Sequence, residues 1–174
     1  MDTVLFLLLG VVILAIIVGA AFLRPWLNRS ATAAGERAGR RFAQEQVQRA
    51  LAEFGTTLRI HAPAAEAQAI LATARQTRSK DFLSLGGETI GIRFVEPDDT
   101  VIRLLPDGDA MLLRVETFRE YMGFPQTAPL WKDLRSRVTA EAEARGVPVT
   151  AGPSASYSRG PLLDDRNARW SRDA

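Results

Sequence analysis

The chain has 174 residues, a formal net charge of +2 and no cysteine. The length allows one modest domain with additional segments, and the small net charge gives the whole chain no strong preference for nucleic acid. The absence of cysteine excludes disulfides, thiol nucleophiles, iron–sulfur clusters and zinc sites built from cysteine.

The first feature along the chain is an apolar run over residues 4–23, VLFLLLGVVILAIIVGAAFL. Twenty helical residues cover about 30 Å, which is the thickness of the hydrocarbon core of a bilayer. A cleaved signal peptide is the alternative, because Val18-Gly19-Ala20 resembles a cleavage site. The preceding residues 1–3 carry no basic side chain and the run is long, so we expect an uncleaved signal-anchor that crosses the membrane once.

Arginines follow the apolar run directly. Residues 24–42 contain five arginines and one glutamate. Basic residues near a membrane span favour the cytoplasmic side, so we expect residues 1–3 outside the cell and everything after residue 23 in the cytoplasm. Anionic lipid headgroups are then the first expected partner. The predicted membrane-interface residues are Arg24, Trp26, Arg29, Arg37, Arg40 and Arg41.

Residues 24–55 are expected to form a basic juxtamembrane region and an amphipathic helix. Ala43, Val47, Ala50 and Phe54 lie on one helix face, and Gly55 can end the helix. This stripe can pack on the downstream domain, pair with a second copy as a short coiled coil, or lie flat on the membrane. Nucleic-acid binding is not expected, because Trp26, which we place at the lipid headgroups, is the one aromatic residue that lies between the arginines of residues 24–41.

A homodimer has one further source of support in the apolar run. Ala15 and Gly19 form a small-xxx-small pair, which lets two membrane helices approach closely. Small residues are also common in such helices, so the pair is a candidate helix-packing site only.

Residues 56–147 are expected to form a small cytoplasmic α+β domain. The pattern predicts about five strands in an antiparallel sheet, with two helices packed on one face. Turn residues separate the strands, including Pro97-Asp98-Asp99 and the run from Pro106 to Asp109. The predicted strands cover 56–61, 82–85, 89–96, 100–105 and 110–117, and the predicted helices cover 63–78 and 129–145.

The strand, the His61-Ala62-Pro63 sequence that starts the next helix, and the long final helix resemble the helix-grip (START-like) domains. The resemblance covers element order over about 90 residues, a span near the small end of domain sizes, and this chain has fewer strands than that family. It implies a lipid or small ligand bound between helix and sheet.

Few residues point to catalysis. His61 is the only histidine, and no nucleophile accompanies it. Asp98, Asp99, Asp107 and Asp109 lie in two turns and lack the spacing of a calcium loop. We therefore predict no catalytic, metal or cofactor residues and no enzyme activity. Near the final helix, Tyr121, Met122, Phe124 and Trp131 belong either to the core or to an exposed patch for a partner, for which Tyr121, Phe124 and Trp131 are the candidates.

The last segment, 148–174, is polar and rich in Pro, Ser and Gly, so we expect a disordered tail. Leu162-Leu163 and Trp170 are a candidate docking motif within it. These observations favour a membrane-tethered adaptor or scaffold that presents a small cytoplasmic domain to an unidentified membrane or cytoplasmic protein. The alternative is a helix-grip domain that binds a lipid or small ligand at the membrane.

Overall fold

A computed structural model describes residues 41–173 of the chain. The predicted membrane segment with Ala15 and Gly19, and the interface residues Arg24, Trp26, Arg29, Arg37 and Arg40, lie outside the described residues. Within 41–173, no helix is long and apolar enough to cross a membrane. Residues from Glu45 onward form one compact unit.

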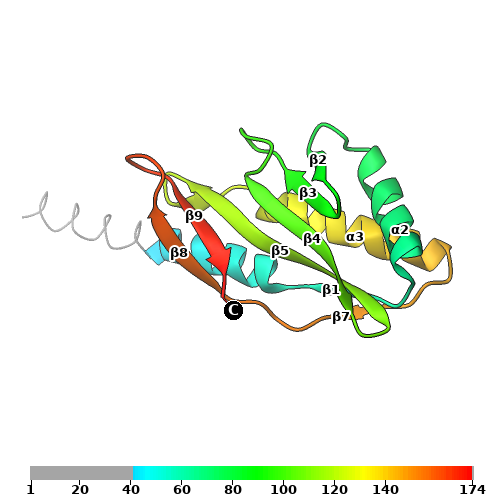
Figure 1. Ribbon diagram of the computed structural model, residues 1–174. Coiled ribbons are helices and arrows are strands. Elements are labelled where there is room, and N and C mark those ends of the chain that lie inside the picture. Colours follow the sequence, from blue (N-terminus) through cyan, green and yellow to red (C-terminus); the bar gives the residue numbers. More distant parts are fainter. Residues whose placement is uncertain (1–40, 174) are drawn as a thin grey trace, which may run out of the picture. The chain divides into compact units, whose positions relative to one another are not determined.

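The described chain is an α+β protein with three helices and nine strands. Figure 1 shows how these elements are arranged. The first helix, over 41–55, is called the entry helix below. The other elements are β1 (Leu58–Ile60), α2 (Ala64–Gln76), β2 (Phe82–Gly86), β3 (Thr89–Ile92), β4 (Thr100–Asp107), β5 (Ala110–Tyr121), β6 (Phe124–Pro125), α3 (Ala128–Ala144), β7 (Val149–Ala151), β8 (Tyr157–Leu162) and β9 (Ala168–Arg172).

The sheet is organised around β5, and every strand pair in it is antiparallel. β2, β3, β4 and β5 follow one another as a meander. Two strands share the other edge of β5 end to end: β1 pairs with residues 111–113, and β9 pairs with residues 117–120. β7 extends the sheet beyond β1, and β8 extends it beyond β9.

The two predicted helices form and pack together against the sheet. The buried face of α2 consists of Ala67, Ile70, Leu71 and Ala74, which is the apolar face expected from the helical spacing. Asp133 of α3 accepts hydrogen bonds from Arg78, just after α2, and from Arg137 of α3. These bonds connect the end of α2 to α3.

The entry helix belongs to the core of the domain from Ala50 onward. Phe54 is fully buried and stacks on Phe118 of β5, with ring centroids 4.2 Å apart. The indole Nε1 of Trp131 donates to the Glu53 carbonyl oxygen at 3.1 Å, and Arg135 forms an ion pair with the Glu53 carboxylate. The C-terminal part of the predicted stripe, Ala50 and Phe54, packs on the downstream domain, which is one of the three arrangements considered.

The expectation of a disordered tail is wrong. The segment 148–174 contributes β7, β8 and β9, and this accounts for most of the difference between nine strands and the expected five. The physical reason is that an exposed strand edge can bind a polar segment through backbone hydrogen bonds alone. Only a few anchoring side chains are then needed. They are Tyr157 and Ala168, which are buried, and Trp170, whose ring stacks on that of Phe118.

Tyr157 lies where the edge of β5 changes its pairing partner from β1 to β9. Its hydroxyl lies 3.0 Å from the carbonyl oxygens of both Phe54 and Val115, and can donate to either. Val115 lies on β5 between the residues paired with β1 and those paired with β9. Burial raises the pKa of the Tyr157 hydroxyl above its ordinary value, so it stays protonated as a donor. The C-terminal strands are thus tied to the entry helix and to β5.

Candidate functional site

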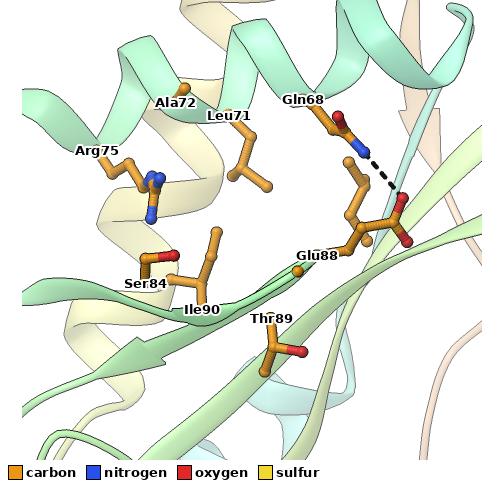
Figure 2. Close-up of a pocket in the computed structure, with 10 residues that line it drawn as sticks. Gln68, Leu71, Ala72, Arg75, Ser84, Glu88, Thr89 and Ile90 are labelled. Carbon is orange, nitrogen blue, oxygen red and sulfur yellow. Dashed lines mark hydrogen bonds between the residues drawn. The ribbon is translucent and has the colours of Figure 1, made fainter.

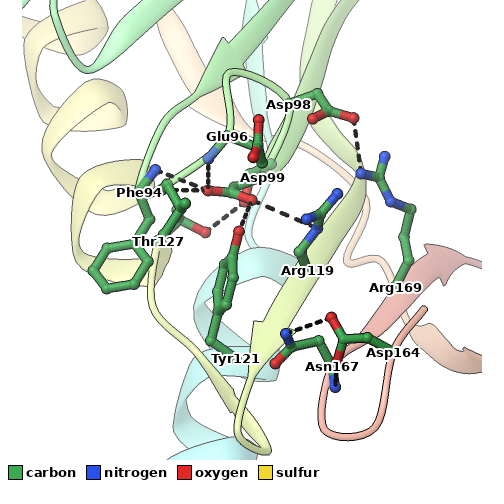
Figure 3. Close-up of polar contacts among 12 residues, drawn as sticks. Phe94, Glu96, Asp98, Asp99, Arg119, Tyr121, Thr127, Asp164, Asn167 and Arg169 are labelled. Atoms are coloured by element: carbon green, nitrogen blue, oxygen red, sulfur yellow. Dashed lines mark hydrogen bonds and ion pairs between the residues drawn. The ribbon is translucent and has the colours of Figure 1, made fainter. Parts of the chain in front are cut away.

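The most distinctive polar cluster surrounds Asp99, in the loop between β3 and β4. Its side chain is fully buried, and its Oδ2 accepts the backbone N–H groups of Phe94, Val95 and Glu96 at 3.1, 2.7 and 2.8 Å. The hydroxyl of Tyr121 donates to Oδ1 at 2.6 Å (Figure 3). Asp99 therefore holds the preceding loop in one conformation and fastens it to the end of β5.

This loop also explains why β3 ends early. We expected a strand over 89–96, but β3 stops at Ile92. The N–H groups of Phe94, Val95 and Glu96 bind the Asp99 carboxylate, so they are not available for the sheet. Burial, followed by the bond to Asp99, raises the pKa of the Tyr121 hydroxyl to about 12, so it remains a donor across the physiological range.

The turn between β8 and β9 lies next to the same cluster. Arg169 of β9 donates to Asp98 at 2.8 Å, and this bond lowers the pKa of the Asp98 carboxyl below its ordinary value. The side-chain oxygen of Asn167 accepts the backbone N–H of Met122 at 3.0 Å. Three segments are thereby joined: the β3–β4 loop (93–99), the β5–β6 turn (122–123) and the β8–β9 turn (163–167). We call them together the loop end (Figure 3).

The loop end carries most of the exposed large apolar side chains of the described chain. Seven such side chains are exposed within 41–173, and five of them lie on the loop end or in the residue next to it. Hydrogen bonds to the buried Asp99 carboxylate and to the Asn167 side chain hold the backbone of these loops, while their apolar side chains face solvent. An apolar patch supported in this way is typical of a contact surface. The five are Phe94 at 53%, Val95 at 57%, Met122 at 67%, Leu162 at 55% and Leu163 at 50% exposed.

Met122 occupies an unfavourable backbone conformation. Its φ is +53°, and the following Gly123 has a φ of +83°. A two-residue hairpin with both φ values positive favours Asn-Gly, because asparagine tolerates the left-handed region far better than a long side chain does. A strained residue with a largely exposed apolar side chain indicates that the side chain is needed for more than folding.

A second candidate is a groove between α2 and the β2–β3 hairpin, which Figure 2 shows in close-up. Its cavity measures about 220 Å³ and opens to solvent. Gln68 of α2 donates to the Glu88 carboxylate at 2.8 Å across one end. Drug-sized ligands occupy pockets of roughly 300–1,000 Å³. The groove is smaller than this range, so it can hold only part of such a ligand. It is lined by Gln68, Leu71, Ala72, Arg75, Ser84, Gly87, Glu88, Thr89, Ile90 and Leu104.

The predicted aromatic partner patch is wrong as a unit. Trp131 is fully buried under the entry helix, with the guanidinium of Arg135 5.4 Å from its ring centroid, so it belongs to the core. Tyr121 and Phe124 are half-buried, and Tyr121 uses its hydroxyl to hold Asp99. Proximity in sequence was misleading here because Trp131, one turn into α3, faces the entry helix and bonds the Glu53 carbonyl oxygen.

The predicted docking motif in the tail is divided by the structure. Leu162 and Leu163 are exposed at the loop end. Trp170 instead donates its indole N–H to the buried Glu120 carboxylate at 2.7 Å, and Arg159 also pairs with that carboxylate. Trp170 therefore fastens the C-terminal hairpin to β5 and is not a free docking residue.

The other polar candidates are separate from one another. The Nε2 of His61 lies 2.9 Å from the Thr150 hydroxyl on the exposed surface, and Arg59 donates to Asp107 at 2.7 Å. Within the described residues, no three His, Cys, Asp or Glu side chains lie close enough together to hold a metal ion. Arg41, the one predicted interface residue that the structure describes, is exposed.

Sequence reasoning missed Phe94 and Val95 as surface residues, and it left Met122 undecided between the core and an exposed patch. The one available signal was Met122-Gly123 at a position where the hairpin turn favours Asn-Gly. Phe94 and Val95 continue the alternation of β3, so they resemble strand residues until the role of Asp99 is known.

Comparison of the chain with protein-family models, with curated proteins and with solved structures finds no match to any of them.

Proposed function

We propose that this chain is a membrane-tethered adaptor or scaffold, anchored by residues 4–23 with its N-terminus outside and its folded domain in the cytoplasm. The observation that carries the proposal is the packing of the entry helix. Phe54 is fully buried against Phe118, and Glu53 is bound by both Trp131 and Arg135. A domain mounted on its own leading helix is presented in a defined orientation relative to that helix.

Tethering supports such a role in thermodynamic terms. A domain confined to the membrane surface meets other membrane components at a high effective concentration, so each contact can be individually weak. The C-terminal hairpin adds to the rigidity of the domain, because Glu120, Arg159 and Trp170 hold it to β5. The partner we propose is a membrane or cytoplasmic protein that recognises this rigid surface.

The experiment has two readouts on the full chain. Reporters that are active only in the cytoplasm or only outside the cell are fused after Ala174, and membranes are washed at alkaline pH. We expect cytoplasmic activity and retention in the washed membranes. Activity of the outside reporter would overturn the orientation, and release of the chain by the wash would overturn the anchor.

The adaptor role has its own test in intact cells. A photo-crosslinking residue at Arg103, on the exposed side of β4, is compared with one at Asp109 in the β4–β5 turn. We expect a discrete protein adduct at one position and not at the other. Equal, diffuse labelling at both positions would contradict a specific partner.

A lipid- or ligand-binding function of helix-grip type is the second candidate, and the groove beside α2 is the observation that favours it. Ala72 lines this groove on α2, so Ala72→Trp would fill it. The ligand hypothesis expects a lipid or small molecule to copurify with the natural chain and to be lost from the variant. Native mass spectrometry that finds nothing bound to either form would remove this candidate.

A further inference from the structure

We propose that the loop end rests against the surface of the bilayer, with its apolar side chains inserted among the lipid headgroups and upper acyl chains. This inference rests on the membrane tether proposed above. It adds the face of the domain that meets the membrane and the residues that make the contact, chiefly Val95, Met122 and Leu163.

The first argument is the geometry of the apolar side chains. They come from three loop tips and not from the face of a helix or strand, and hydrogen bonds join the tips to one another. Leu163 donates its N–H to the Asn167 carbonyl oxygen, and the Asn167 side chain binds the N–H of Met122. The patch is therefore small and pre-formed, as expected for side chains that penetrate only the interfacial region.

The second argument is the direction from which the chain enters the domain. Tyr157, at the start of β8, bonds the Phe54 carbonyl oxygen at the C-terminal end of the entry helix, and β8 leads from there to the loop end. Residues 24–40 separate the predicted anchor from the described part. They can span at most about 60 Å when extended, and about 25 Å as a helix. The loop end thus stays within reach of the bilayer, and a weak apolar contact is sufficient.

The third argument is charge. The loop end and its supporting strands carry basic side chains at Arg93, Arg119, Arg166 and Arg169, and acidic ones at Glu96, Asp98, Asp99, Asp164 and Asp165. Asp98 and Asp99 are paired with arginine. This surface is nearly balanced, so its contact with lipid is apolar in origin. We expect similar contact with phosphatidylcholine vesicles and with vesicles that also contain phosphatidylglycerol.

The full chain offers a direct measurement because it has no cysteine. A single environment-sensitive fluorophore is placed through Asp165→Cys at the loop end, or through Asp109→Cys in the β4–β5 turn. These positions lie near opposite ends of β5, whose twelve residues extend about 40 Å. Both proteins are reconstituted in vesicles that contain lipids with a nitroxide quencher high on the acyl chain.

We expect strong lipid quenching of the Asp165 label and little quenching of the Asp109 label. A double variant, Val95→Ser with Met122→Asn, should reduce quenching at Asp165 to the level seen at Asp109. The matched control is Leu85→Asn, which removes an exposed apolar side chain of β2 outside the loop end. It should leave the quenching unchanged.

Three results would overturn the inference. Equal quenching at the two labels would show that the loop end does not face the bilayer. Quenching at Asp165 that survives the double variant would show that proximity comes from the tether alone. A label shielded from water only at high protein density, without lipid quenching, would identify a second copy or another protein as the occupant.

Failure of the tether is scored separately by floating the vesicles after an alkaline wash. If the chain is washed away but the Asp165 label is quenched at neutral pH, the anchor is wrong and the lipid contact stands. If the chain resists the wash and the label is not quenched, the anchor stands and the lipid contact is wrong.

Discussion

Replacement of Phe54 by alanine tests whether the entry helix is a structural part of the domain. Phe54 is fully buried, and its ring stacks on that of Phe118 at 4.2 Å. Loss of a buried phenylalanine side chain removes about 1.5–3 kcal/mol of burial free energy. The lost aromatic pair adds about 0.5–1.5 kcal/mol. With the cavity that remains, the free energy of unfolding should fall by about 3–5 kcal/mol.

The assay is thermal unfolding of the full chain in detergent, followed by near-ultraviolet circular dichroism. The expected loss is a large part of the roughly 5–15 kcal/mol that stabilises a typical domain. It should lower Tm by roughly 10–20 °C for a domain of this size. Phe42→Ala is the matched control, because Phe42 is 61% exposed, and it should change Tm by no more than about 2 °C. A loss below about 1 kcal/mol for Phe54→Ala would refute the docking of the entry helix.

Four further outcomes follow from particular contacts. Met122→Asn should raise the free energy of unfolding by about 1 kcal/mol, because asparagine relieves the positive φ, and denaturant titration measures the gain. Truncation before Tyr157 should unfold the domain, since Tyr157, Ala168 and Trp170 anchor the C-terminal strands; a truncated chain that keeps a cooperative melt would contradict this. Arg103→Glu should stabilise the sheet by up to about 1 kcal/mol in low salt, because Arg103 lies directly opposite Arg114. Hydrogen bonds from Arg137, and to a smaller extent from Arg78, lower the folded-state pKa of the Asp133 carboxyl. Their contribution to the free energy of unfolding is therefore complete above about pH 4, the ordinary pKa of an aspartate, and it is lost as the pH falls below that value. Asp133→Asn should therefore reduce the acid sensitivity of Tm, while costing less than about 1 kcal/mol at neutral pH.

The central part of the fold was predictable because it depends on local periodicity. The buried face of α2 follows from apolar residues at helical spacing, and the β4–β5 hairpin follows from its Pro-Asp-Gly-Asp turn. These signals lie within one element or between neighbours in sequence, where a single sequence carries the most information.

The rest could not be predicted because it depends on contacts between distant segments. The strand β9 forms against a β5 edge some fifty residues earlier, and backbone hydrogen bonds leave no signature in composition. The loop end likewise depends on Asp99, which resembles any turn aspartate until its three N–H partners are known. The exposed patch was missed for the same reason, since exposure of Phe94 and Val95 follows from that loop.

The shared edge of β5 has a consequence for the order of events during synthesis. β9 completes the sheet beside residues 117–120, which lie about fifty residues earlier in the chain. During translation β5 therefore leaves the ribosome well before β9 has been made. The half of the β5 edge that β9 covers stays unpaired during that interval, and it needs protection from strand pairing with other nascent chains.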